Sequence, residues 1–293
     1  MATDDLTLAP ALAPSRVFYS TGRMLGVEDF QADQDYHRGR LARALLQVYG
    51  SGTISGLLVQ TDGNPDPAAV EVQVTPGLAI DRIGRIIEVP RLVCIVLNDW
   101  LTSQAQAWLQ QQSNPVPGQP SLADLNDAIH DGTHLMCDVF ATFIPCTRGV
   151  TPCFASQDDY DATDAFSANR LLDSFAMRLV LRTDATPLTP ADPWAIIPVP
   201  PAGTGLTPAA ATTIQALLLQ GTAGAATAAN EYPPGFDASS VFLARMLIGA
   251  TPGAAGAPPT WDLTKISIDN TARLFLYPAA LLARLMGLDS GAD

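Results

Sequence analysis

Soft metal ligands gather in the middle of the sequence, where His134, Cys137, Cys146 and Cys153 follow one another. Zinc accepts three cysteines and one histidine in a tetrahedral structural site. Such sites usually pair their ligands in two short knuckles, whereas here only His134 and Cys137 are closely spaced. On a strand, positions three apart also point to opposite faces. A zinc site, a Cys146–Cys153 disulfide and free thiols therefore all remain open, and free thiols are favoured.

A second group of polar residues lies near the N-terminus, where Asp33 and Asp35 precede His37. A histidine beside carboxylates is typical of general acid–base chemistry. On a helix, however, Asp33 and His37 are neighbours at i and i+4, which favours a simple contact on the helix surface. We therefore predict that His37 has a structural role.

The remaining motifs give no chemistry. Aspartates at 158, 159, 161 and 164 resemble a calcium loop, but the central glycine and terminal glutamate of an EF-hand are missing, so we expect a solvated acidic loop. GxSxG, Walker, HExxH and dinucleotide-type glycine motifs do not occur where a strand and a helix would give them meaning. We predict a protein that is not an enzyme, with no cofactor and no metal.

Composition limits the partners. The chain has 293 residues, is 47% hydrophobic and carries a formal net charge of −13. This content supports a sizeable core, and the negative charge argues against nucleic acid and anionic membranes as partners. No apolar run is long enough to span a bilayer. The acidic N-terminus lacks the order of a signal peptide, so we expect synthesis in the cytosol and reduced cysteines.

A long helix over residues 28–48 is the element that should organise the fold. Gly26 is an acceptable N-cap, and Phe30, Leu41, Leu45 and Val48 fall on one helical stripe. Gln34 and His37 fall on the same stripe. We expect this stripe to be buried against a sheet, with hydrogen-bond partners for the two polar side chains coming from the strands that follow.

The rest of the chain predicts an α+β fold with mainly antiparallel sheet. Alternating valines predict a strand over 70–74, and residues 70–97 read as a β-meander whose last strand, 91–97, is buried on both faces. We expect a flexible arm over 1–15, a main body over 16–183, and a second lobe or extension of the same sheet over 184–293. Further predicted helices cover 99–112, 122–130, 207–220 and 278–286, further strands cover 55–60, 134–144, 174–183, 240–248, 263–269 and 273–277, and long loops cover 145–164, 187–206 and 251–259.

Four segments, in order along the chain, resemble one known family. They are GRMLGVEDFQADQDYHRGRL followed by GSGTISGLLV; VTPGLAIDRIGRIIEV; HLMCDVFATFIPCTRGVTPCF with FAMRLVL; and VFLARMLIG with ISIDNTARLFLYP. They are similar to structural proteins of contractile phage tails and phage tail-like injection systems. We expect structural roles for Gly56, Pro76, Gly77, Asp81, Gly84 and Arg85, of which the glycines and Pro76 mark sharp turns of the chain.

What this resemblance implies is a non-enzymatic subunit near a baseplate, tail-fibre root or terminal adaptor. Such a subunit assembles with itself in three-fold or six-fold symmetry and docks neighbouring tail or baseplate proteins in a virion or tail-like particle. Two other functions remain. A receptor- or glycan-binding module of a tail fibre would use Trp194, Tyr232 and Trp261 as stacking surfaces, and a hydrolase would use His37 or His134.

Overall fold

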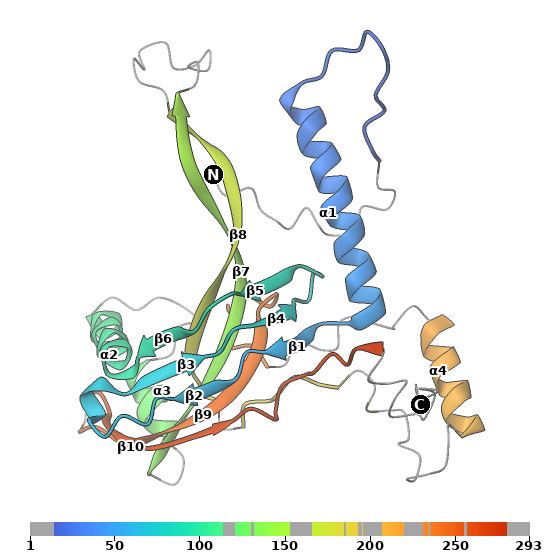
Figure 1. Cartoon of the computed structure of the whole chain (residues 1–293). Coiled ribbons are helices and arrows are strands. Elements are labelled where there is room, and N and C mark those ends of the chain that lie inside the picture. The colour runs from blue at the N-terminus through green and yellow to red at the C-terminus, as the bar shows by residue number, and fades with distance from the viewer. Residues whose placement is uncertain are drawn as a thin grey trace, which may run out of the picture.

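The computed structural model has an α+β fold with mostly antiparallel sheets, as the sequence predicts (Figure 1). The structure describes residues 15–113, 121–129, 132–152, 166–184, 186–192, 195, 207–219, 231–233, 235–254 and 257–279. Nearly all of the predicted N-terminal arm, the aspartates at 158–164, most of the 187–206 loop and all but the start of the predicted 278–286 helix lie outside these residues, as do Cys153 and Trp194.

A kinked antiparallel meander forms the first part of the body. The chain passes three times through two small sheets, ordered β1-β4-β5 and β2-β3-β6, so that each pass contributes one strand to each sheet. Leu57 has a φ of 55° at the kink in the first pass. The predicted meander is therefore present, and it begins earlier than expected. Its strands are β1 (Gly52–Gly56), β2 (Val59–Thr61), β3 (Glu71–Val74), β4 (Gly77–Ile80), β5 (Ile86–Val89) and β6 (Val93–Val96).

Alternating burial shows which face of the meander meets the core. Val72 and Val74 are fully buried while Glu71 and Gln73 beside them are not, as the valine alternation predicts. The expectation that the 91–97 strand is buried on both faces is wrong. Among the described strands β6 pairs with β3 alone, and Cys94 in its middle is exposed, so one face of this edge strand is open.

A four-stranded sheet, ordered β10-β9-β7-β8, forms the second part. β9 pairs with β7 only from His134 to Ala141, whereas β8 pairs with β7 from Cys137 to Pro152. The outer halves of β7 and β8 therefore leave the body as a two-stranded ribbon (Figure 1). The predicted 145–164 loop is thus partly wrong, because its first residues continue β7. The strands are β7 (His134–Pro152), β8 (Phe166–Leu181), β9 (Val241–Thr251) and β10 (Thr260–Asp269).

Short helices close the body. The predicted helices over 99–112, 122–130 and 207–220 are present as α2 (Leu97–Ser113), α3 (Leu122–Asp127) and α4 (Pro208–Leu219), and η2 (Pro67–Ala69) is a single 3-10 turn. Side chains of α2, α3 and β7 make a second small core. The predicted 273–277 strand is reduced to one bridge between Thr53 and Phe275. None of the described helices is long and apolar enough to cross a bilayer.

The long N-terminal helix α1 (Val27–Tyr49) is present, but it does not lie across the sheet. Gly26 caps its N-terminus, and the Gly26 N–H donates to Asp29 Oδ2 at 3.0 Å. Gly50, with a φ of 82°, caps its C-terminus. Ala42 is its only buried residue. Figure 1 shows α1 rising away from the body on the same side as the β7–β8 ribbon. The expected packing of its whole length on the meander is therefore wrong.

Candidate assembly surface

The glycine in the turn between β4 and β5 is where α1 meets the body. Gly84 has a φ of 94°, a conformation that favours glycine. A Cβ on Gly84 would lie 2.1 Å from the carbonyl oxygen of Ala42 and 3.0 Å from its Cα. Because no real side chain tolerates these distances, the closeness of α1 to the sheet depends on glycine at this position.

One buried carboxylate fixes that turn. Asp81 is fully buried and accepts hydrogen bonds from the Ile83 N–H at 2.9 Å, the Arg85 N–H at 2.8 Å and Arg85 Nε at 2.6 Å. Burial raises the pKa of Asp81, and the Arg85 guanidinium opposes that shift. Arg85 also donates to Ser239 Oγ at 2.9 Å and lies 4.6 Å over the Phe143 ring. The turn under α1, which belongs to the β1-β4-β5 sheet, is thus also tied to the four-stranded sheet.

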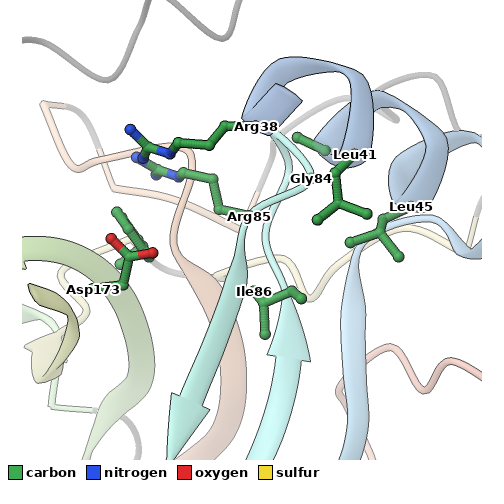
Figure 2. A pocket seen from close by; sticks show the side chains of 9 residues that line it. Arg38, Leu41, Leu45, Gly84, Arg85, Ile86 and Asp173 are labelled. Atoms are coloured by element: carbon green, nitrogen blue, oxygen red, sulfur yellow. The ribbon is translucent and has the colours of Figure 1, made fainter. Parts of the chain in front are cut away.

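A small pocket of about 120 Å³ lies beside this joint. Figure 2 shows polar residues, Arg38, Arg85 and Asp173, toward one side of it and the apolar Leu41 and Leu45 toward the other. It sits between the C-terminal half of α1, the Gly84 turn and the start of the β7–β8 ribbon. The pocket therefore marks the joint from which α1 and the ribbon both project.

A second close approach lies at the kink of the meander. A Cβ on Gly56, which has a φ of 62°, would lie 2.0 Å from the Pro76 carbonyl oxygen. A Cβ on Gly77 would lie 2.3 Å from the Ser55 carbonyl oxygen. The structure therefore places Gly56, Pro76 and Gly77 together where two strands touch through their backbones.

The stripe of α1 that the sequence predicts to be buried is exposed. Phe30 is 54% exposed and Leu41 57%, Gln34 is exposed, and only Leu45 is partly buried. The His37 side chain is 73% exposed, and its Nε2 lies 3.7 Å from Asp33 Oδ1, so the predicted i, i+4 contact is present. The expectation that strands supply partners for Gln34 and His37 is wrong, because the helix meets the body through the side that carries Ala42.

A buried ionic network that the sequence reasoning missed holds the four-stranded sheet to the segments around it. Asp138 is fully buried and accepts from Arg182 Nη1 at 2.9 Å, Arg245 Nε at 2.8 Å and Arg245 Nη2 at 2.9 Å. Arg182 also binds Asp184 and the carbonyl of Glu231. An aspartate inside an apolar strand segment was the available signal, because buried charges need partners.

The candidate metal ligands do not come together among the residues that the structure describes. His134 Nδ1 lies 2.8 Å from Thr133 Oγ1, and Cys137 is fully buried, so that burial raises the pKa of its thiol. Cys146 is partly exposed on the ribbon. Within the described ranges, no group of three His, Cys, Asp or Glu residues is placed to hold a metal ion. The zinc site and the Cys146–Cys153 disulfide stay untested, since Cys153 lies outside those ranges.

Two of the three aromatics proposed for glycan stacking take part in core packing. Tyr232 stacks on Phe140 with ring centroids 5.6 Å apart, and Arg82 lies 5.3 Å over its ring. Burial raises the pKa of Tyr232. Trp261 lies on β10 and packs against both the main hydrophobic core between the sheets and the second small core of α2, α3 and β7. Both side chains are partly buried. Tyr232 lies outside the helices and strands, as expected, whereas the expected loop position of Trp261 is wrong, because it belongs to β10.

Comparison with known proteins finds distant likenesses among solved structures only. No family model and no curated protein matches the chain. Among solved structures, the fold is similar to the crystal structure of TssK at 9% sequence identity and a TM-score of 0.28. The match covers 85% of this chain and 43% of the TssK chain, so the chain spans less than half the length of that protein.

Proposed function

We propose that this protein is a structural subunit of a contractile phage tail or a phage tail-like injection system, with no catalytic role. It works by assembling with further copies in a three-fold or six-fold ring and by docking neighbouring baseplate or tail proteins. The observation that carries the proposal is the exposed apolar surface of α1 and of residues 18–25, which lead into it. This helix leaves the body.

The exposed side chains are large and close together in the sequence. Phe18 is 76% exposed, Met24 94%, Val27 68% and Val48 71%. Phe18 and Met24 precede α1, and Val27 and Val48 lie near its two ends. The helix is about 34 Å long at a rise of 1.5 Å per residue. Apolar surface of this extent is typical of a binding surface on a folded protein. The free energy gained by burying it becomes available when another chain covers it.

The geometry of the joint between α1 and the body also supports an assembly role. Gly84 lets α1 approach the sheet at one point, and Asp81 and Arg85 hold that point rigid. A helix anchored at one end presents its remaining surface in a fixed direction. This arrangement suits a subunit that must offer a docking element at a defined angle to its neighbours.

The sequence resemblance supports the same function, since its first two segments build this part of the molecule. The first segment runs through α1 into β1, and the second covers β4, the Asp81–Arg85 turn and β5. The two histidines of the hydrolase alternative, by contrast, lie on separate elements. His37 is on α1 beside Asp33, and His134 is on β7 beside Thr133. Nothing in their surroundings favours a hydrolase over an assembly subunit.

The proposal is tested by asking where the protein is found in the cell that makes it. A tagged chain should sediment with tail-like particles, and it should leave that fraction when Leu41→Asp places a charge on the exposed surface of α1. Val93→Thr, on the edge strand β6, is a control away from α1 and should stay with the particles. A wild-type chain found only as a free protein, in cells that produce intact particles, would refute the proposal.

A further inference from the structure

A set of exposed residues on α1, which includes all of the predicted stripe except Leu45, follows a heptad. Seven residues recur at alternating spacings of three and four along the whole helix, and every one of them is exposed. This is the pattern of a seam that packs against another helix. The seam residues are Val27, Phe30, Gln34, His37, Leu41, Ala44 and Val48.

The charges of α1 divide between its two halves. The first nine residues carry only acidic charges, and the remainder carries only basic ones. Two such helices side by side in the same direction bring like charges together at both ends, whereas opposite directions bring each acidic half to a basic half. The acidic residues are Glu28, Asp29, Asp33 and Asp35, and the basic residues are Arg38, Arg40 and Arg43.

We propose that α1 packs antiparallel against α1 of a second copy of this chain, an inference that rests on the proposed function and specifies one of its contacts. With the helices centred between residues 35 and 36, Phe30 faces Leu41 of the second copy and Gln34 faces its His37. Asp33, beside the seam, faces Arg40 of the second copy on the same side. Each of these contacts occurs twice, because the pair has a two-fold axis.

The central layer gives the two polar seam residues their partners. Gln34 has an amide that both donates and accepts, and His37 has two ring nitrogens that can do either. In a parallel pair each would meet its own kind, and in the antiparallel pair the amide meets the imidazole. A polar layer in an apolar seam also fixes the register of a helix pair. The occupant of the seam is thus a second copy, because the seam and its charges complement themselves.

The seam alone makes a contact smaller than the roughly 1,200 Å² or more that a standard stable interface buries in total. A strip about 34 Å long and about 10 Å wide covers roughly 340 Å² on each helix, within the range of the largest apolar patches on monomers. The neighbouring Phe18, Met24 and Leu25 add exposed apolar side chains next to the start of the helix. A two-fold contact links chains in pairs, so the ring of the proposed function would be built from or joined through such pairs.

Charge reversal tests the orientation directly. Asp33→Arg and Arg40→Asp should each weaken self-association by about ten-fold at low salt, since each change turns two symmetric attractions into repulsions. Mixing the two single variants should restore association as a heterodimer, because the two reversed side chains then face each other and the two native ones do the same. Sedimentation equilibrium of the full chain measures the association of each single variant and of their mixture. Matched controls reverse charges outside the seam, with Asp35→Arg and Arg43→Asp, and should associate like the wild type.

The outcomes separate this inference from the function on which it rests. A wild-type chain that stays monomeric throughout the concentration range overturns the α1 pair. An oligomer in which the mixed variants are no stronger than either alone also overturns it and leaves the assembly function in place. Weakening by the single variants, recovery on mixing and unchanged controls support the antiparallel pair, and a parallel pair cannot produce that recovery, because it places Asp33 and Arg40 far from each other.

Discussion

The Gly84→Ala substitution tests the joint between α1 and the body. Its Cβ would lie 2.1 Å from the Ala42 carbonyl oxygen, and the φ of 94° is unfavourable for any side chain. The unfavourable φ costs about 1–2 kcal/mol, and forcing extra volume into a packed contact costs about 1–3 kcal/mol. The total of roughly 2–5 kcal/mol exceeds what a helix with one buried residue gains from docking. We expect α1 to detach while the three sheets stay folded.

Hydrogen exchange with mass spectrometry measures this outcome segment by segment. Amides of α1 should lose protection in the Gly84→Ala variant, while those of β7 and β9 should keep it. Gly63→Ala is the matched control, because Gly63 has a φ of 70° and its added Cβ would have no heavy atom within 4 Å. It carries the conformational cost without the clash. Equal protection of α1 in the two variants would refute the claim that Gly84 sets the contact.

Three further predictions concern the core, the thiols and one surface carboxylate. Asp138→Ala should lower the free energy of unfolding by about 3–5 kcal/mol in urea titrations, because two arginines lose their shared buried carboxylate; a change below about 1 kcal/mol would contradict the network. In the native protein Cys94 should react with a thiol reagent quickly and Cys137 only after unfolding, since one is exposed and the other buried; equal rates would contradict that placement. Hydrogen bonds from the side chains of Lys265 and Thr264 lower the pKa of Asp262 to about 2. This pKa lies below the unfolded value, so the stability from this group is present at neutral pH and is lost as the pH falls through about 2; Lys265→Met should raise the pKa in an NMR titration, and an unchanged pKa would contradict the assignment.

The sequence predicts the elements better than their partners. Alternating valines identify β3, and the apolar stripe identifies α1, because burial periodicity follows directly from backbone geometry. The same stripe cannot say what covers it. An i, i+3, i+4 pattern is equally suited to the chain's own sheet and to a second helix, which is why the sequence alone places Phe30 and Gln34 against the wrong surface.

The joint and the ionic network depend on contacts between residues far apart in the chain. The turn pattern in the sequence identifies Gly84 as structural, but its close contact with the Ala42 carbonyl is visible only when α1 is placed. Asp138 and Arg245 become partners because β9 pairs beside β7 in one register. The length of β7 cannot be predicted from the sequence either. A proline ends most strands, yet Pro145 is accepted on the outer part of the ribbon, where β8 is the one described partner of β7.

Cryo-electron microscopy of particles purified through a tag on this chain tests the central claim most directly. We predict a tail-like particle in which the chain recurs with closed symmetry and the Phe30, Leu41 and Val48 surface of α1 is covered by another chain. A tag that recovers only a lone monomer with α1 open to solvent, from cells whose particles are complete without it, would contradict an assembly role for this protein.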